Sequence, residues 1–302
     1  MKVVLDFLWL LLILLFSYLE SFFKLFIPLK RKSVGGEIVL ITGAGHGIGK
    51  NTAKLFANLQ CVLVLWDINQ QGIEETAAEC RQIGARVYTY VVDCCKREEI
   101  YTAANKVKQD VGDVGILINN AGIIFCADGL TIKDEQIQKM FEVNILAHFW
   151  TTRAFLPSIL QNNHGHIVTV ASTAGFVGVP YMMHYCSSKF AAFGFHKSLT
   201  AELFALGKLG VKTSCLCPVF VNTGFVKNPS ARFVPILQPE DVAQELVDGI
   251  LKNKKIICVP PSVSFTPMLE YFLPERALKA LNEFHQVKFD AEVRCSDSNK
   301  DK

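Results

Sequence analysis

Short apolar runs recur along the chain from residue 36 onwards, separated by longer stretches of mixed polarity. The runs fall at Ile38–Ile41, Val62–Trp66, Val87–Val92, Gly115–Ile118, His166–Val170, Val211–Leu216 and Ile256–Val259. Their length and β-branched content are typical of strands buried on both faces, and each intervening stretch is long enough for a crossover helix. The alternation predicts an α/β fold in which helices cover both faces of a doubly wound parallel sheet.

The first 28 residues have a different pattern. Between Asp6 and Glu20 lies FLWLLLILLFSYL, which carries no charge, and Lys30, Arg31 and Lys32 follow shortly afterwards. No small-residue cleavage site appears, and the run is shorter than the twenty or so residues of a spanning helix. We therefore expect residues 1–28 to be an uncleaved anchor in one membrane leaflet and residues 29–35 to be a basic linker. A buried core helix is the alternative.

Composition narrows the function classes. Half of the 302 residues are hydrophobic, and the net charge of +3 is too small and too evenly spread to favour nucleic-acid binding. The ten cysteines form no CxxC pair, and most lie in apolar runs. This pattern indicates reduced thiols in a domain that faces the cytosol.

The stretch TGAGHGIG, at residues 42–49, joins the first predicted strand to a predicted helix at Lys50–Leu59. Glycines at 43, 47 and 49 allow a tight turn, a close approach of the backbone to a pyrophosphate and close packing of helix on strand. A tight turn without a ligand is the alternative interpretation. The flanking strand and helix favour a dinucleotide site.

An acidic residue follows at the expected interval. The second apolar strand, CVLVLWD, ends at Asp67, where a carboxylate can bind a ribose 2′-hydroxyl. A 2′-phosphate would meet this negative charge, and His46 before Gly47 provides no fixed cation to offset it. The sequence therefore predicts NAD rather than NADP.

Three further residues carry candidate chemistry. Ser172 follows a predicted strand, and Tyr185 and Lys189 are four residues apart, on one face of a helix. A neighbouring ammonium favours the phenolate, which would lower the pKa of the tyrosine and allow proton exchange at neutral pH. A pair at this spacing is often only an exposed helix face, so the prediction depends on the other motifs.

Taken together, the motifs resemble those of the short-chain dehydrogenase/reductase family. They include ITGAGHGIG, LVLWDIN, NNAG at 119–122, FEVNILAHFW and YCSSKF. The resemblance implies a Rossmann-type sheet and a catalytic tetrad. In it Tyr185 is the general acid/base, Lys189 lowers its pKa and binds the nicotinamide ribose, Ser172 orients the substrate oxygen, and Asn144 holds a water.

The same resemblance places the cofactor contacts. They are Gly43, Gly45, His46, Gly47, Ile48, Gly49, Asp67, Asp93, Cys94, Asn120, Ala121, Gly122, Tyr185, Lys189, Pro218, Phe220, Val221 and Thr223. The chain departs from the family at one place, because Val219 stands where a glycine commonly follows Pro218. This change puts the geometry of the substrate loop in question.

The resemblance implies NAD-dependent oxidation of a lipophilic alcohol, such as a hydroxysteroid, retinol or another bioactive lipid, at lipid droplets and the endoplasmic reticulum. It also implies a homodimer. Two alternatives stay open: a lipid-droplet surface scaffold with little catalysis, and an NADPH-dependent ketone reductase. No metal is expected, since His164 and His166 have no third ligand nearby in sequence. His184, beside Tyr185, either touches the substrate or lies on the helix surface.

The dehydrogenase domain is expected to span residues 36–260. Residues 261–295 are rich in Phe, Leu and Pro, and we expect them to close the substrate pocket or to contact the membrane. An ordinary helical cap on the sheet is the alternative. The polar residues 296–302 are predicted to be disordered.

Overall fold

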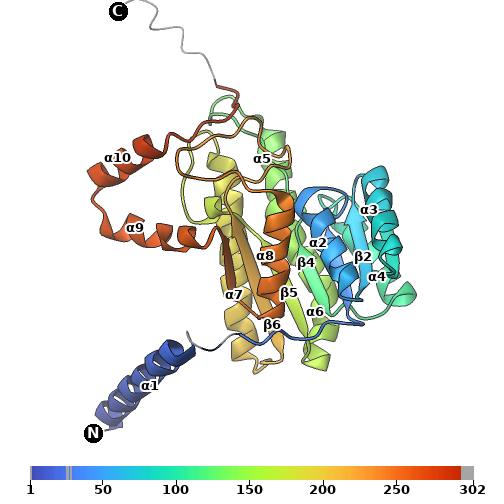
Figure 1. The fold of residues 1–302 in the computed structure, drawn as a ribbon, viewed down its shortest axis with the longest axis horizontal. Coiled ribbons are helices and arrows are strands. Elements are labelled where there is room, and N and C mark those ends of the chain that lie inside the picture. The colour runs from blue at the N-terminus through green and yellow to red at the C-terminus, as the bar shows by residue number, and fades with distance from the viewer. Residues whose placement is uncertain (1, 25–26, 28, 294–302) are drawn as a thin grey trace, which may run out of the picture. The chain divides into compact units, whose positions relative to one another are not determined.

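The computed structural model describes residues 2–24, 27 and 29–293, and the predicted disordered tail lies outside them. The chain divides into two units, Met1–Ser33 and Val34–Lys302. Figure 1 draws the chain as a ribbon whose colour runs from blue through green and yellow to red along the sequence.

The first unit is dominated by a single helix, α1, at Lys2–Lys24. At 1.5 Å per residue its 23 residues extend for about 34 Å. Its segment Lys2–Glu20 has a mean hydropathy of 2.2 and is long and apolar enough to cross a membrane. The large apolar side chains described on α1 are 44–79% exposed, so this unit does not bury them by itself. The apolar helix suggests membrane association.

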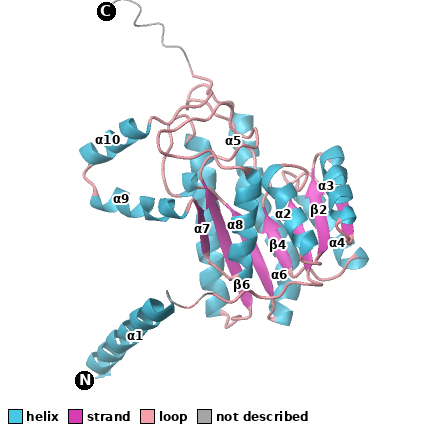
Figure 2. Cartoon of the chain, viewed as in Figure 1, coloured by secondary structure: helices cyan, strands magenta, loops and turns pink. Residues whose placement is uncertain are grey.

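The second unit contains a seven-stranded, wholly parallel sheet in the order β3-β2-β1-β4-β5-β6-β7 (Figure 2). The strands are β1 Ile38–Thr42, β2 Val62–Asp67, β3 Val87–Val91, β4 Ile116–Asn119, β5 Gly165–Val170, β6 Val211–Pro218 and β7 Ile256–Val259. All seven predicted strands are confirmed, to within two residues at either end. The doubly wound α/β fold is confirmed with them.

Helices cover both faces of this sheet, because side chains of successive strand residues point to opposite faces. On one face, Val39 and Ile41 of β1 pack with α2 (Gly47–Asn58), α3 (Gln70–Gln82) and α8 (Pro239–Leu251). On the other face, Leu40 packs with α4 (Arg97–Asp110), α6 (Ala147–Asn162) and α7 (Met183–Ala205). Full burial of each large apolar side chain contributes roughly 1.5–3 kcal/mol to stability.

The strand order reverses between β1 and β4, and ligands of doubly wound sheets bind at the carboxyl ends of the strands at such a point. Three shorter helical segments lie in this region: α5 (Asp134–Phe141), the π-helical turn Glu142–Leu146 and the 3-10 turn Thr173–Gly175. The nine cysteines among the described residues are all free, which agrees with the expected reduced thiols.

The C-terminal segment forms the 3-10 turn Pro261–Phe265, α9 (Thr266–Phe272) and α10 (Glu275–His285). Beyond α10 the chain returns to the domain, where Lys288 pairs with Ser230 and Glu292 pairs with Ala127. Residues of α9 and α10 line the main cavity of the domain, so this segment is more than a cap on the sheet.

Candidate active site

The glycine loop between β1 and α2 is shaped for close backbone contact. Gly43 and Gly47 adopt φ values of +67° and +55°, which residues with a side chain rarely adopt. A Cβ at Gly49 would lie 2.1 Å from the carbonyl oxygen of Gly43, so only glycine fits at this position. The loop therefore leaves the N-terminal amides of α2 accessible to an anion such as a pyrophosphate.

The NNAG segment after β4 holds this loop in place. Thr42 Oγ1 accepts hydrogen bonds from the backbone N–H groups of Asn120 and Ala121, each at 3.0 Å. Asn120 Nδ2 donates to the carbonyl oxygens of Thr42 at 2.8 Å and of Gly43 at 3.0 Å. Thr42 is a structural member of the site that our sequence reasoning did not single out, although it begins the glycine motif.

Asp67, at the end of β2, contacts the same loop. Its Oδ2 accepts a hydrogen bond from Gly45 N–H and its Oδ1 accepts one from Asn69 N–H, both at 2.9 Å. The half-buried carboxylate also lines the main cavity. It is therefore placed to present an oxygen acceptor beside the glycine loop.

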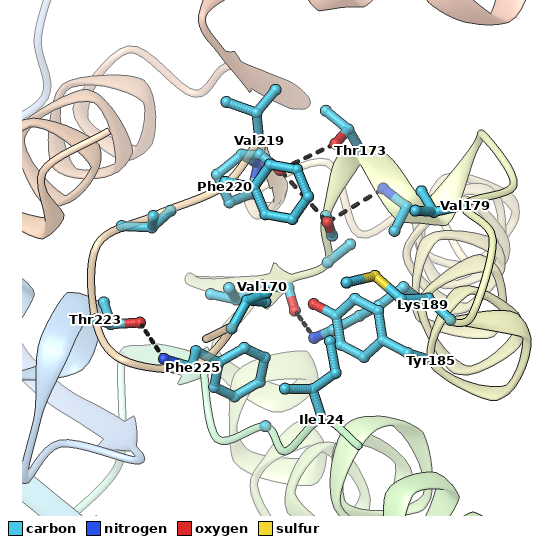
Figure 3. Close-up of a pocket in the computed structure, with 18 of the residues that line it drawn as sticks. Ile124, Val170, Thr173, Val179, Tyr185, Lys189, Val219, Phe220, Thr223 and Phe225 are labelled. Carbon is cyan, nitrogen blue, oxygen red and sulfur yellow. Dashed lines mark hydrogen bonds between the residues drawn. The ribbon is translucent and has the colours of Figure 1, made fainter. Parts of the chain in front are cut away.

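Tyr185 and Lys189 of α7 lie beside Val170 at the end of β5 (Figure 3), and Ser172 follows that strand. Lys189 Nζ lies 5.8 Å from the centre of the Tyr185 ring and donates a hydrogen bond of 2.9 Å to the carbonyl oxygen of Val170. The Ser172 hydroxyl hydrogen-bonds Tyr185, accepts from Ala174 N–H at 3.1 Å and donates to the Pro218 carbonyl oxygen at 3.4 Å. All three side chains line the cavity.

The electrostatics of this group differ from the expectation that Lys189 lowers the tyrosine pKa. Burial raises the pKa of Tyr185 well above its usual range, and the hydrogen bond with Ser172 opposes this rise only in part. Burial also lowers the pKa of Lys189 to about 8, although the nearby thiols of Cys215 and Cys217 oppose that fall. Desolvation dominates because both side chains are enclosed in the protein. A phenolate at neutral pH thus requires additional positive charge nearby.

Asn144 lies in the π-helical turn, a feature that is frequent at functional sites. Its Oδ1 accepts from Ile123 N–H at 2.8 Å, and its Nδ2 donates to the Ile123 carbonyl oxygen and to Ser188 Oγ. Ser188 Oγ in turn donates to the carbonyl oxygen of Tyr185 at 2.7 Å. Asn144 therefore fixes the loop after NNAG against α7, and Ser188 is a supporting residue that the sequence analysis missed.

One cavity of about 900 Å³ joins these groups to an apolar chamber. It runs from Gly43 and Asp67 past Tyr185 to an apolar end. That end is formed by Phe220, Phe225, Phe233, Leu269, Leu278 and Leu281. Of the sequence-predicted site residues, Gly45, Gly49 and Asn144 do not line it, because they pack behind the loops that do.

The departure at Val219 does not disrupt the backbone. Val219 N–H donates to the carbonyl oxygen of Val259 at 3.0 Å, which extends the pairing of β6 with β7 by one residue. Because the backbone here does not have a positive φ, a β-branched residue fits without strain. Farther along the same loop, the Phe225 ring packs edge-on against the Tyr185 ring, with 6.1 Å between the ring centres.

The three histidines that the sequence analysis considered each have a hydrogen-bond partner. His184 is buried, so its interpretation as a surface residue is wrong, and its Nε2 hydrogen-bonds the carbonyl oxygen of Phe125 at 2.7 Å. His164 Nε2 pairs with Glu37 on the surface, and His166 Nε2 bonds Ser214 Oγ in the core. Within the described part of the chain, no group of three or more His, Cys, Asp or Glu side chains is arranged to hold a metal.

Comparison with known proteins agrees with this geometry. Human 17-beta-hydroxysteroid dehydrogenase 13 is 60% identical over 97% of this chain and 98% of its own length. Human estradiol 17-beta-dehydrogenase 11 is 61% identical over the same shares.

Solved structures share the fold. A short-chain dehydrogenase/reductase from Burkholderia phymatum in complex with NAD superposes with a TM-score of 0.74 at 26% identity, covering 83% of this chain and 96% of its own. An alcohol dehydrogenase from Thermococcus sibiricus complexed with 5-hydroxy-NADP superposes with a TM-score of 0.65 at 26% identity. The match covers 74% of this chain and 94% of that one. These neighbours bind both NAD and NADP forms, so the fold alone does not select between the two cofactors. Residues 37–232 match the short chain dehydrogenase family model, and the chain belongs to that family of oxidoreductases.

Proposed function

We propose that this protein oxidises the hydroxyl group of a lipophilic alcohol with NAD as the hydride acceptor. The observation that carries the proposal is the position of Tyr185 in one continuous cavity, between the glycine loop and an apolar chamber. A chamber lined by Phe and Leu side chains favours a largely apolar substrate. The names of the relatives indicate that this substrate is a steroid or a lipid of similar shape.

The residues of the site have the following proposed roles. The Tyr185 phenolate takes the proton of the substrate hydroxyl while hydride leaves the same carbon. Ser172 holds the substrate oxygen by a hydrogen bond, and Lys189 supplies positive charge on the ring side of Tyr185. When bound, oxidised NAD supplies the hydride acceptor and a positively charged ring. This added positive charge lowers the pKa of Tyr185 and so opposes the effect of burial, which raises it.

The test of the function is NADH formation by the full chain in detergent or on lipid droplets. Estradiol, retinol and long-chain fatty alcohols are offered with NAD or NADP, and NADH or NADPH is followed by absorbance. Turnover with NAD supports the proposal. Cofactor binding without turnover of any lipid alcohol would instead favour a surface scaffold, and faster ketone reduction with NADPH would favour the reductase.

Asp67 is proposed to select NAD, and we expect Asp67→Ser to weaken that preference. The variant removes the carboxylate that faces the glycine loop, so a 2′-phosphate no longer meets a negative charge. The ratio of kcat/KM for NAD to that for NADP should fall by roughly 100-fold, which corresponds to about 2.7 kcal/mol. Asp93→Ser, one strand farther along the cavity, is the control and should leave the ratio within threefold of wild type. An unchanged ratio in Asp67→Ser would remove Asp67 from cofactor selection.

We further propose that residues 1–28 anchor the protein to the lipid-droplet monolayer and the endoplasmic reticulum membrane. The support is the exposed apolar helix α1 and the basic residues 30–32 that follow it. Residues 29–35 would then be the linker and residues 36–260 the catalytic domain, facing the cytosol, where free cysteines persist.

Residues 261–295 are proposed to act both as a lid and as a membrane contact. One side of α9 and α10 lines the cavity through Leu269, Leu278 and Leu281. Met268, Tyr271 and Phe272 of α9 are 53–88% exposed. Such exposed apolar groups beside a lipophilic pocket favour a lipid surface from which substrate enters.

Replacing Tyr271 and Phe272 together by serine is expected to raise the KM for a lipid alcohol presented in vesicles by about tenfold, since apolar burial in the membrane is lost. The KM for a water-soluble short alcohol should not change. Lys279→Gln on α10, which removes only a surface ion pair with Glu275, is the control. Equal effects on both substrates would indicate damage to the pocket instead of a lost membrane contact.

A homodimer is also proposed. Leu146, Phe149 and Phe190 are 40–47% exposed on or next to the outer faces of α6 and α7. Two copies could cover these side chains by packing the same helices against each other.

A further inference from the structure

His148 is a fully enclosed polar side chain without a partner. It lies in the first turn of α6 and is 2% exposed, and neither ring nitrogen has a hydrogen-bond partner among the described residues. Leaving a buried polar group unsatisfied costs about 1–3 kcal/mol, and folded proteins commonly satisfy such groups with an internal water. Packing alone does not explain a histidine at this position.

The helices place His148 beside the catalytic face of α7. Asn144 Nδ2 bonds Ser188 Oγ at 3.0 Å, and four residues later the His148 ring lies 6.1 Å from the Phe195 ring. The two helices therefore run side by side in the same direction. Since helical side chains lean towards the N-terminus of their helix, the imidazole is directed towards the turn that carries Ser188 and Lys189.

Two neighbouring groups have unmet hydrogen-bonding capacity as well. The Lys189 ammonium has three N–H donors, and among the described residues only the Val170 carbonyl oxygen accepts from it. Thr169 Oγ1, on the preceding residue of β5, is buried without a partner. Thr169 lies between Ile167 and Ala171, which face the layer of α6 and α7. Three polar groups thus share one layer of the core, between β5, α6 and α7.

The charges of this layer are coupled. Burial lowers the pKa of His148 to about 3, and the positive charge of Lys189 is the second cause. The titratable groups that act on Lys189 besides His148 are Tyr185 on α7, whose pKa is raised by burial, and Cys215 and Cys217 on β6. His148 is therefore neutral, with one ring nitrogen that donates and one that accepts.

We propose that His148 is a positioning residue for the tyrosine–lysine pair: it holds an internal water against the Lys189 ammonium. The water accepts from the ammonium and donates one hydrogen to the acceptor nitrogen of His148 and the other to Thr169 Oγ1. In this way it compensates part of the desolvation that lowers the pKa of Lys189, and so keeps the charge that Tyr185 requires. The kinetic part of this inference rests on the proposed function.

The kinetic test compares His148→Leu with His148→Gln. Leucine fills the space without a polar atom, so the pKa of Lys189 should fall further below about 8. Activity is lost as pH rises through that pKa. The alkaline limb of kcat/KM should therefore move down by about one pH unit, a roughly tenfold loss of activity at alkaline pH. Glutamine restores a polar partner and should return the limb to the wild-type position.

Phe149→Leu is the matched control, because Phe149 contacts the same Phe195 ring without offering a polar atom. It should not move the alkaline limb. If His148→Leu and His148→Gln both keep the wild-type profile, His148 is only a packing residue and the proposal fails.

A second test does not depend on turnover. A crystal structure of the full chain that shows ordered water should place one water within about 3.2 Å of both a His148 ring nitrogen and Lys189 Nζ. A dry layer, or a direct hydrogen bond between His148 and Lys189, would overturn the inference. The water can be observed whether or not the protein turns over a substrate. This test therefore distinguishes failure of the His148 proposal from failure of the proposed dehydrogenase function.

Discussion

Replacing Tyr185 by phenylalanine is expected to reduce turnover of a lipid alcohol by about 10³-fold while leaving the affinity for cofactor close to that of wild type. The change deletes one oxygen atom from a ring that is 8% exposed, so the fold and the cavity wall should persist. The lost oxygen is the proposed base, and a positioned acid or base contributes roughly 10²–10⁴ to the rate. The measurements are NADH formation and cofactor affinity, the latter by calorimetry.

Tyr181→Phe is the matched control for this variant. Tyr181 lies four residues earlier, is 48% exposed and does not line the cavity. Its loss of a hydroxyl should leave turnover within twofold of wild type. Turnover by Tyr185→Phe at more than a tenth of the wild-type rate would show that another group is the base, and Ser172 would then be the first to examine.

Much of the fold could be predicted because the apolar pattern of the strands and the residues of the turns favour the same α/β structure. The strand β1 is short, β-branched and followed by glycines, so apolar burial on both faces and the turn chemistry agree. The same holds for β2, whose apolar run ends at the acidic Asp67. The spacing of Tyr185 and Lys189 on one helix was likewise sufficient to bring both into one cavity.

Other features could not be predicted because they depend on contacts between distant segments. The four-residue spacing predicted an ammonium beside the phenol, yet the hydrogen bond of Lys189 goes to Val170, nineteen residues away. Nothing local in the sequence indicates that Tyr185 is buried deeply enough to raise its pKa. The hydrogen bond between His184 and the Phe125 carbonyl oxygen could not be predicted for the same reason, since it joins residues 59 positions apart.

The other large expected effect concerns Gly49, where alanine should weaken cofactor binding by roughly 100-fold or more, about 2.7 kcal/mol. The added Cβ would lie 2.1 Å from the Gly43 carbonyl oxygen and 2.6 Å from Asn120 Nδ2. That oxygen also accepts a hydrogen bond from Asn120, so the loop cannot move away without breaking the link between β1 and β4. The amides at the start of α2 would then lose their alignment for a pyrophosphate.

Gly194→Ala separates this steric effect from a general effect of adding a methyl group. Gly194 lies within α7, and a Cβ there would meet nothing within 4 Å. Alanine at an exposed helix position should stabilise the domain by about 0.5–1 kcal/mol and leave cofactor affinity unchanged. Calorimetry with NAD, together with thermal unfolding followed by circular dichroism, measures both variants. If Gly49→Ala bound NAD within threefold of wild type, the glycine loop would not be the pyrophosphate site, because the loop glycine with the tightest backbone contact would have proved dispensable.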